Sequence, residues 1–327
     1  MAKRKKNKQK KSNLWGKILF GVSVILIMGV GIALGTVYKT LSKLDNVDIK
    51  NEDLGIVSDE ELKKYNNYEK ITNIALFGID SEDGLGRSDS IMIATIDPVH
   101  DKLKISSIMR DSYVNIDGHG YDKINHAYAF GRAPLSIKTI NETFGLNIED
   151  FIAVDFASLP IIIDMLGGIE LNITNEELTE INNIIPHLNQ VNSAFSPLLT
   201  HTGVQKLDGI QAVAYTRIRH ATGGDYVRTE RQRIVLSSLF NIALSINPSQ
   251  YLGLINDVLP LVKTSLDTND ILSLITKVAT MSGGTLEQER FPRDGYCQSE
   301  MINEIYYLTF DESSTKQQMM DYIFDDN

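Results

Sequence analysis

The sequence is poor in residues that build covalent or metal-based scaffolds. Its 327 residues include one cysteine, Cys297, so an intramolecular disulfide cannot form and a zinc site built from cysteines is excluded. Proline and glycine number 8 and 23, too few for a collagen-like or low-complexity chain. With 43% hydrophobic and 23% charged residues, the composition is that of a globular protein with one large or two modest domains.

Familiar catalytic motifs are also absent from the sequence. None of the six histidines has His-Glu-x-x-His spacing, and there is neither a Gly-x-Ser-x-Gly turn nor a Walker A loop. Each histidine is therefore interpreted as a surface or turn residue rather than a metal ligand. Candidate chemistry has to be sought among the acidic and basic side chains.

Positive charge is concentrated at one end of the chain. Eight of the 32 lysines and arginines fall within residues 1–17, and no acidic residue precedes Asp45. The remaining 24 basic residues face 42 acidic ones, which leaves the rest of the chain with a net charge of −18. A body this acidic is a poor general binder of nucleic acid, so no nucleic-acid partner is expected.

An uncharged apolar segment follows the basic tail. Residues 18–38 are 21 positions without a charge, and a helix of that length spans about 30 Å, the thickness of the hydrocarbon core of a bilayer. The positive-inside rule places residues 1–17 in the cytoplasm and the body outside, as a single-pass type II protein of the cell membrane. The alternative is a cleaved signal peptide, but its apolar region would be shorter and followed by an Ala-x-Ala site, which is absent here.

Segments typical of strands and helices alternate after residue 70. The predicted strands cover residues 71–80, 90–97, 103–110, 151–155, 169–173 and 286–291, with a hairpin between the second and third. The predicted helices cover residues 136–144, 158–166, 209–215, 226–246, 250–262, 269–281 and 315–324. This alternation predicts an α/β fold built on a layered sheet.

The domain boundaries follow changes in composition. The predicted parts are a basic tail at 1–17, a transmembrane helix at 18–38, a polar stalk at 39–70 with a short helix near 59–65, a catalytic domain at 71–245, and a segment at 246–327 that completes the same domain or forms a separate module. Within the catalytic domain, residues 174–200 form a polar excursion rich in asparagine.

Two aspartates lie at the ends of predicted strands. Asp80 closes the strand over 71–80, and Asp89 follows a glycine-bearing loop just before the next strand. The two carboxylates can converge at one end of the sheet, where they would suit Mg²⁺, a hard cation that also takes phosphate oxygens as ligands. The alternative is that Asp80 is a turn residue and Asp89 a salt-bridge partner of Arg87. Spacing alone favours this alternative, because aspartate is common after strands.

The basic residues of the body are densest between residues 217 and 233. Arginine occupies five of these 17 positions. Arginines bind phosphate oxygens in bidentate fashion, and a helix N-terminus favours an anion, so the cluster predicts a pyrophosphate site. The alternative is a solvated helix whose arginines pair with neighbours such as Glu230. Arg110 and Asp111, at the end of a predicted strand, and Lys123 are expected to add to the anion site.

Spacing indicates which of these side chains converge. Arg217 and Arg219 alternate in a segment expected to be extended, so both face one side. Arg228 and Gln232 are four residues apart on a predicted helix and share a face. The four side chains are expected to meet at one anion, and without that anion the arginine charges would repel each other. Arg233 is expected to point away from this face.

Four stretches of the chain stand in an order that is typical of one protein family. They are NIALFGIDSEDGLGRSDSIMIATID, ISSIMRDSYVNIDGHGYDKINHAYAFG, FIAVDFASLPIIIDMLGGIELNI and LDGIQAVAYTRIRHATGGDYVRTERQR. They span about residues 71–240, and together they resemble the LytR-CpsA-Psr family of Gram-positive bacterial envelope proteins. The predicted anchor topology agrees with this resemblance. The long excursion at 174–200 and the segment after 245 are less like the family.

The resemblance implies a type II membrane protein whose external α/β domain has a mixed central sheet flanked by helices. It implies a phosphotransferase that moves a glycopolymer, such as wall teichoic acid or capsular polysaccharide, from a polyprenyl-pyrophosphate carrier to the 6-hydroxyl of N-acetylmuramic acid in peptidoglycan. Polyprenyl phosphate is the implied leaving group and Mg²⁺ the implied cofactor. The prenyl chain needs an apolar slot, which the run at 156–166 could line or could equally pack as ordinary core.

The functional residues of the family match positions of this sequence. Its magnesium-linked aspartates match Asp80 and Asp89, and its pyrophosphate-binding glutamine matches Gln232. Its basic pyrophosphate-binding residues match Arg110, Lys123, Arg217, Arg219 and Arg228, of which the four arginines are also candidate catalytic residues. Asp89 either orients or deprotonates the acceptor hydroxyl, or acts only as a metal ligand.

Two other functions remain open from the sequence. A hydrolase that releases the glycan to water would use the same metal and arginines. A non-enzymatic envelope regulator or attenuator would need neither the paired aspartates nor the arginine cluster. Analysis of the products with and without peptidoglycan separates the first of these from a transferase.

Overall fold

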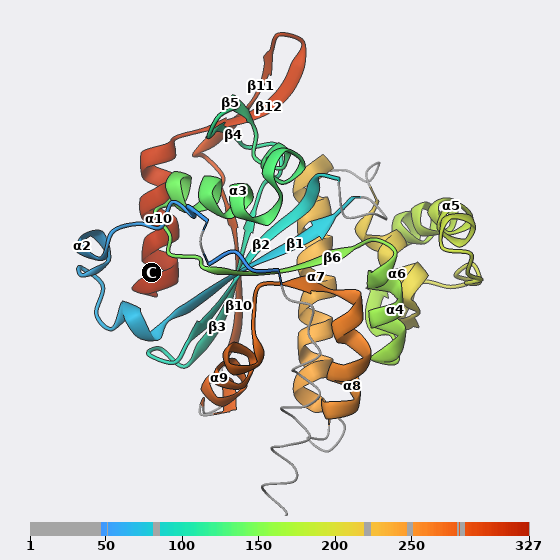
Figure 1. The fold of residues 1–327 in the computed structure, drawn as a ribbon. Coiled ribbons are helices and arrows are strands. Elements are labelled where there is room, and N and C mark those ends of the chain that lie inside the picture. The colour runs from blue at the N-terminus through green and yellow to red at the C-terminus, as the bar shows by residue number, and fades with distance from the viewer. Residues whose placement is uncertain are drawn as a thin grey trace, which may run out of the picture. The chain divides into compact units, whose positions relative to one another are not determined.

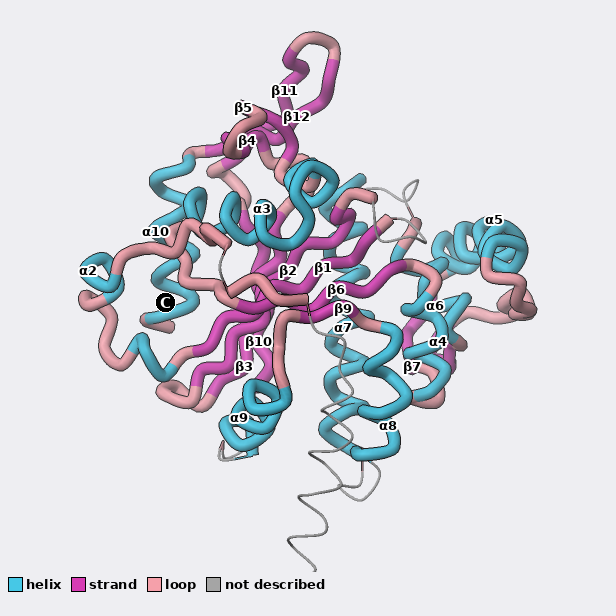
Figure 2. Tube along the Cα trace, in the orientation of Figure 1, coloured by secondary structure: helices cyan, strands magenta, loops and turns pink. Residues whose placement is uncertain are grey.

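A six-stranded mixed sheet forms the centre of the folded domain. The computed structural model describes residues 47–50, 52–80, 86–218, 224–246, 251–279, 281 and 285–326. The strand order is β10-β3-β2-β1-β6-β9, as Figures 1 and 2 show. The strands are β1 (Thr72–Ile79), β2 (Ser88–Asp97), β3 (Lys102–Ile108), β6 (Asp150–Asp155), β9 (Lys263–Thr264) and β10 (Thr285–Phe291). The pairs β1–β6 and β3–β10 are parallel and the other neighbours antiparallel, so the predicted mixed α/β class is confirmed.

Helices pack against both faces of the central sheet (Figure 1). The long ones are α3 (His126–Phe144), α5 (Asn175–Val191), α7 (Gly224–Ser245), α9 (Thr268–Ala279) and α10 (Glu312–Phe324). Shorter helices are α2 (Asp59–Leu62), α4 (Ser158–Met165), α6 (Gly209–Thr216) and α8 (Tyr251–Val258), with 3₁₀ turns η1 (Tyr68–Lys70) and η3 (Leu259–Leu261). The predicted helices form, although α3 begins ten residues before its predicted start at 136.

Alternation along β1 assigns each face of the sheet to different helices. Ala75, Phe77 and Ile79 are buried in the main core, which also contains buried side chains of α3 and α10. The intervening Leu76 and Gly78 face α7 across an apolar groove. Burial of each large apolar side chain contributes about 1.5–3 kcal/mol, so this two-sided packing fixes both the register of β1 and the position of α7.

A second hydrophobic core lies under α4, α5 and α6. It is closed by β7 (Ile169–Ile173) and β8 (Gly203–Leu207), an antiparallel pair separate from the central sheet. Here the structure corrects the sequence prediction, because much of the supposed polar excursion at 174–200 is the 17-residue helix α5. A capping box of Thr174 and Glu177 starts this helix. Ile181, Ile185 and Leu188 are buried at helical spacing. Asn182 and Asn189 donate to the backbone carbonyls of Leu199 and Ser196 in the segment that follows, each at 2.9 Å.

Two short hairpins were not predicted from the sequence. They are β4 (Tyr113–Ile116) with β5 (Gly120–Lys123), and β11 (Cys297–Ile302) with β12 (Ile305–Phe310). The second hairpin turns through Asn303 and Glu304, whose φ angles of 50° and 66° give the double left-handed turn that matches strand twist. Strands this short carry too little hydrophobic alternation to stand out in a sequence.

The ends of the described chain pack onto the domain. Four side chains of the segment expected to be a stalk are buried in the main core: Ile49, Leu54, Leu62 and Tyr65. After residue 245, β9 and β10 add a strand to each side of the central sheet. The predicted membrane span at 18–38 lies outside the described residues, and no helix within the described part is long and apolar enough to cross a membrane.

Candidate active site

One edge of the sheet gathers the predicted acidic and basic residues. Asp80 follows β1, and Arg110 stands two positions after β3, which runs in the same direction as β1. Asp89 is the second residue of β2, which runs the opposite way, so its start lies at the same edge. The topology therefore brings these three residues together, as the positions at strand ends predicted.

Asp89 is the centre of a buried ion-pair cluster. Its side chain is only 2% exposed, and its Oδ2 accepts from Nη1 of Arg110 at 2.8 Å and from Nη2 of Arg228 at 2.9 Å. Nδ2 of Asn125 donates to Oδ1 at 3.4 Å. Burial alone would raise the pKa of Asp89, but the charges and hydrogen bonds of Arg228 and Arg110 outweigh it and lower the pKa below its ordinary value. Asp89 is therefore an anion at neutral pH that holds two arginines in place.

Asp111 extends this cluster to a lysine. Its Oδ2 lies 3.5 Å from Nε of Arg110, and its Oδ1 lies 2.6 Å from Nζ of Lys123. Arg110 and Lys123 are each about one-fifth exposed, so both can reach a ligand at the surface. The structure thus places the predicted pyrophosphate-binding residue Arg110 against Asp89 and links Lys123 to Arg110 through Asp111.

Arg217 forms a second, more open ion pair. Its Nη2 lies 3.7 Å from Oδ1 of Asp80, whose side chain is 41% exposed, and its guanidinium stacks 4.2 Å from the ring centre of Phe156. Arg217 is the C-cap of α6 rather than part of an extended segment, so that expectation was wrong: α6 continues through Thr216 and ends at the arginine. Arg219 lies outside the described residues, and its expected convergence with Arg217 stays a prediction.

The spacing argument on α7 holds in the structure. Arg228 and Gln232 are both buried, and while Arg228 binds Asp89, Gln232 lines the apolar groove. Arg231 points elsewhere and binds Glu177 of α5 at 3.2 Å. Burial lowers the pKa of Arg233, which lies five residues after Arg228 on α7, and its expected orientation away from Asp89 stays a prediction.

An apolar groove begins at the charged cluster and runs between the sheet and α7. Its volume is about 360 Å³. Apolar side chains of β1, β2, β6, α4 and α7 line most of it, among them Leu76, Met92, Val154, Leu159, Val235, Leu236 and Leu239. Val235 is also part of the second core. Of the run at 156–166, Phe156 and Leu159 line the groove.

The charges of the site are compensated without a ligand. The sequence predicted arginines that repel each other until an anion binds, but Arg110 and Arg228 share Asp89, and Arg217 faces Asp80. The prediction failed because these aspartates are far from the arginines in the sequence. Asn125, the N-cap of α3, was missed as a site residue, and only its position two residues after Lys123 hinted at it.

The side chains at the site include two carboxylates that can serve as metal ligands. Among the described residues, no three His, Cys, Asp or Glu side chains lie together as a ready metal cage. Asp80 and Asp89 nevertheless offer the hard carboxylate oxygens that Mg²⁺ prefers, and a magnesium ion in a phosphate-transfer site takes most of its other ligands from water and phosphate. The donor set therefore fits magnesium bound together with a phosphorylated substrate.

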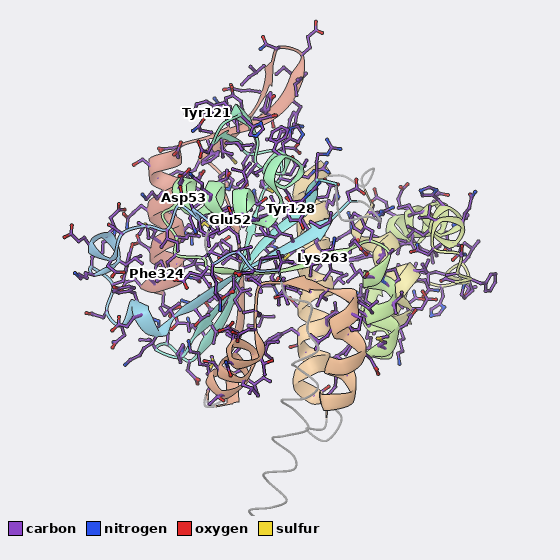
Figure 3. All side chains as sticks on the ribbon, viewed as in Figure 1. Glu52, Asp53, Tyr121, Tyr128, Lys263 and Phe324 are labelled. Atoms are coloured by element: carbon purple, nitrogen blue, oxygen red, sulfur yellow. The ribbon has the colours of Figure 1, made fainter. Side chains whose placement is uncertain are left out.

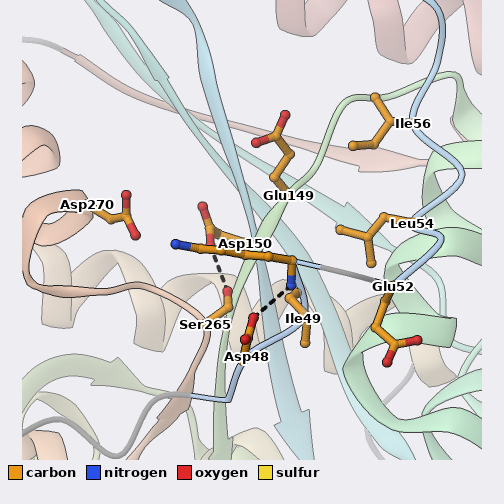
Figure 4. Close-up of a pocket in the computed structure, with 10 residues that line it drawn as sticks. Asp48, Ile49, Glu52, Leu54, Ile56, Glu149, Asp150, Ser265 and Asp270 are labelled. Carbon is orange, nitrogen blue, oxygen red and sulfur yellow. Dashed lines mark hydrogen bonds between the residues drawn. The ribbon is translucent and has the colours of Figure 1, made fainter.

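A second pocket opens at the other end of β6. Its volume is about 510 Å³, and Figure 4 shows carboxylates on several sides of it, including Glu149, Asp150 and Asp270. Ser265 Oγ donates to Asp150 at 2.8 Å, and burial raises the pKa of Asp150. This pocket is lined by several carboxylates and by no arginine, so it is not the anion site that the sequence predicted.

Comparison with known proteins agrees with the fold and with the resemblance of the motifs. Residues 34–322 match the LytR_cpsA_psr family. The polyisoprenyl-teichoic acid–peptidoglycan teichoic acid transferase TagU of Oceanobacillus iheyensis is 33% identical over 327 residues, with 95% of each chain covered. The solved structure of TagT bound to LIIa-WTA is 25% identical, with a TM-score of 0.63 over 83% of this chain and 96% of that chain.

A further solved structure shares the fold. It is the LytR-CPS2A-psr family protein YwtF (TagT) with bound octaprenyl pyrophosphate lipid, with a TM-score of 0.59, 22% identity, and coverage of 85% of this chain and 95% of that chain. The family match extends over most of the sequence, and the TagU relative aligns along nearly its whole length. The chain therefore belongs to the LytR_cpsA_psr family.

Proposed function

We propose that this protein transfers an anionic glycopolymer from a polyprenyl-pyrophosphate carrier to peptidoglycan, as the name of its TagU relative describes for that protein. One observation carries the proposal: an apolar groove lies next to the arginine cluster, since Ser90, which lines the groove, directly follows Asp89, the partner of Arg110 and Arg228. A ligand that fits both must have a pyrophosphate head and a hydrocarbon tail. Gln232 marks the junction, because it lines the groove one helical turn after Arg228.

The binding mode follows from charge and polarity. The prenyl tail occupies the groove beside Leu76 and Leu236, and the pyrophosphate lies against Arg110, Arg217 and Arg228. Arginine forks match phosphate oxygens, and each charge-assisted hydrogen bond contributes about 1.5–3 kcal/mol. The arginines are already positioned by Asp80 and Asp89, so substrate binding does not have to order them.

The reaction is a substitution at the phosphorus that carries the glycan. The oxygen of the acceptor hydroxyl forms a bond to this phosphorus, and the bond from phosphorus to the bridging oxygen breaks. The bridging oxygen leaves with the electron pair as part of polyprenyl phosphate, and the hydroxyl proton is lost to a base. The product is a phosphodiester between glycan and acceptor. The arginines stabilise the charge that builds on the leaving phosphate.

The environment of Asp89 favours one of its two predicted roles. A general base works best when its pKa lies near the working pH. Arg110 and Arg228 lower the pKa of Asp89, which makes it a weak base in this arrangement. The proposed role is therefore to position the arginines and to offer an oxygen to a metal ion, rather than to remove the hydroxyl proton.

Magnesium is the proposed cofactor, held by Asp80 and Asp89. When bound, it would neutralise phosphate charge and so lower the barrier to attack by the hydroxyl. The chain's own contribution is to present both carboxylates at the same edge of the sheet. The chemistry of the two side chains and their place at the site support this assignment.

The proposed location is the outer face of the cell membrane. The support is the basic tail at 1–17 followed by the uncharged segment at 18–38. A lipid-linked substrate and a peptidoglycan acceptor would both be within reach of a domain anchored there. Protease added to protoplasts should remove the domain, and protection of the domain would contradict this orientation.

The proposed function is tested with purified protein, a glycan on a polyprenyl-pyrophosphate carrier, and peptidoglycan. The expected product is glycan covalently attached to peptidoglycan, with polyprenyl phosphate released in equal amount. Omission of peptidoglycan should suppress the release. Release at the same rate without peptidoglycan would identify a hydrolase, and absence of both products would contradict an enzymatic role.

A further inference from the structure

Four tyrosines and a lysine form one surface beside the candidate active site. The ring centres of Tyr113 and Tyr121 lie 5.2 Å apart, and Tyr307 lies 4.7 Å from Tyr113. Nζ of Lys123 lies 5.6 Å from the ring centre of Tyr306 and 5.8 Å from that of Tyr307. We call these five residues the tyrosine surface.

Two hairpins build the tyrosine surface. On β4–β5, Tyr113 and Lys123 are direct cross-strand partners, and Tyr121 lies two residues before Lys123, so all three share one face. The β11–β12 hairpin is attached beside them, because the backbone N–H of Leu308 donates to the carbonyl of Asp111 at 2.9 Å. That contact places Tyr306 and Tyr307 against the face of β4–β5.

Two rings of the tyrosine surface are well exposed to solvent. Tyr121 is 59% exposed and Tyr306 is 36% exposed, whereas Tyr113 is half-buried and Tyr307 is buried at 7%, where its ring supports that of Tyr113. The β11–β12 hairpin projects from the domain in Figure 1, and Figure 3 shows Tyr121 near its base. Exposed aromatic rings on a projecting two-stranded hairpin add little to the core, and apolar exposure gathered in one place is typical of a binding surface.

The tyrosine surface is continuous with the ion-pair cluster of the site. Lys123 contacts two of the tyrosine rings and also pairs with Asp111 at 2.6 Å, and Asp111 lies 3.5 Å from Arg110. The hydroxyl of Tyr307 donates to Asp122, the neighbour of Lys123, at 3.3 Å. A molecule lying on the tyrosine surface would therefore end beside Asp89 and its arginines.

We propose that the tyrosine surface binds the glycan strand of the acceptor, a polymer of N-acetylated amino sugars. The inference rests on the proposed function, which requires an acceptor hydroxyl next to the arginines. Pyranose rings present flat faces of C–H groups that stack on aromatic rings, while tyrosine hydroxyls and the lysine can bind sugar oxygens and N-acetyl carbonyls. Continuity with the arginine cluster favours the acceptor, because the prenyl tail of the donor already has the groove.

The charge of the hairpin favours a glycan over a lipid surface. The turn that carries the exposed Met301 and Ile305 also carries Glu304, which is exposed. An anionic membrane surface would repel this carboxylate, whereas a glycan strand stripped of its peptides would not exclude it.

Binding of soluble, peptide-free peptidoglycan glycan strands to the full chain in detergent tests the inference directly. Tyr121→Ala and Tyr306→Ala should each weaken binding about threefold to tenfold, the loss expected for one stacked ring. The matched control is Tyr296→Ala, because Tyr296 is 43% exposed but lies by Glu61 and Lys64, on another surface. Tyr121→Trp should restore binding, since it keeps a stacking ring.

Lipid binding and transfer are measured on the same variants. Tyr121→Ala and Tyr306→Ala should keep the wild-type affinity for polyprenyl pyrophosphate and raise the KM for the acceptor while kcat stays near wild type. Unchanged glycan binding in both variants would overturn the inference even if the wild-type protein transfers glycan. If the protein transfers nothing but its glycan binding depends on these two tyrosines, the proposed function fails and the inference stands. Loss of self-association or of vesicle binding in place of glycan binding would also overturn it.

Discussion

The substitution Asp89→Asn distinguishes the role of Asp89 in stability from its role in glycan transfer. In the wild-type protein one carboxylate oxygen accepts hydrogen bonds from two guanidinium groups, at 2.8 Å and 2.9 Å, and all three side chains are largely buried. The substitution keeps the size and shape of the side chain, removes its charge and replaces one acceptor oxygen by an NH2 donor. Arg110 and Arg228 then lose their shared counter-ion but keep their own charges.

The cost of that change can be worked from the geometry. The two donor nitrogens contact the same oxygen, so they are no more than about 6 Å apart, and two unit charges at that distance repel by about 3 kcal/mol at an effective dielectric of about 20. Breaking a buried ion pair typically costs about 3–5 kcal/mol, and the asparagine keeps a neutral hydrogen bond. We therefore expect the free energy of unfolding to fall by about 2–4 kcal/mol, and Tm by roughly 5–10 °C.

Pyrophosphate should reverse part of this loss. The variant lacks the carboxylate charge that Arg110 and Arg228 share, although Arg110 still faces Asp111, and an anion that binds there supplies the missing charge. Inorganic pyrophosphate should therefore raise the Tm of Asp89→Asn more than that of the wild-type protein, although the variant loses glycan transfer. Asp89→Asn is thus expected to bind the anion more strongly while it loses glycan transfer. A variant that had merely unfolded would lose both.

Thermal melting with and without inorganic pyrophosphate is the assay, with Asp80→Asn as the matched control. Asp80 is 41% exposed and 3.7 Å from Arg217, so its ion pair contributes at most about 1 kcal/mol and the control should melt near the wild-type temperature. A wild-type Tm for Asp89→Asn, or an equal pyrophosphate shift in both variants, would refute the role assigned to Asp89 in holding the arginines.

Four further outcomes follow from the same structure. Because the pKa of Asp89 is lowered, its stabilising charge is present at pH 7, so the urea unfolding curves of wild type and Asp89→Asn should begin to approach each other below the ordinary aspartate pKa of 3.8 and coincide only once the pH is below the lowered value. Arg217→Ala should abolish most transfer with little change in Tm, since its ion pair is open to solvent; a Tm loss equal to that of Asp89→Asn would contradict this. Leu236→Trp should weaken polyprenyl-pyrophosphate binding about tenfold and leave inorganic pyrophosphate binding intact, and equal loss of both would argue against a prenyl groove. Arg132→Gly should raise the free energy of unfolding by about 1 kcal/mol in the same urea assay, because Arg132 has φ 58° and ψ −153°, a conformation that favours glycine; no gain would show that this backbone is unstrained.

The sequence by itself determined the fold class and most of the central elements. Isoleucine-rich runs with small residues between them predicted β1, β2, β3 and β6 to within two residues at each end, because a strand buried on both faces needs apolar side chains along its whole length. Helical spacing placed Arg228 and Gln232 on one face of α7, since that relation depends on local geometry alone.

Prediction from neighbouring residues failed for elements that are stabilised by contacts with residues far away in the sequence. The asparagine-rich run at 174–200 folds as α5 because Ile181, Ile185 and Leu188 find a core supplied by α6 and β7. The hairpins β4–β5 and β11–β12 are too short to be recognised singly, and the tyrosine surface exists only because a backbone hydrogen bond between Leu308 and Asp111 brings them together.

Electrostatic pairing was decided by the tertiary structure. The sequence shows a dense arginine cluster but not the carboxylates that compensate it, because Asp89 lies far from Arg228 along the chain and meets it only when α7 packs on the sheet. Lys104 is a second example of pairing that the sequence does not show. Its position in a strand does not reveal whether its side chain is buried. In the structure the side chain is fully buried, with Nζ 2.9 Å from Asp97 and 3.1 Å from Asp326. Secondary structure follows mainly from neighbours in sequence, whereas charges and grooves depend on which surfaces the fold brings into contact.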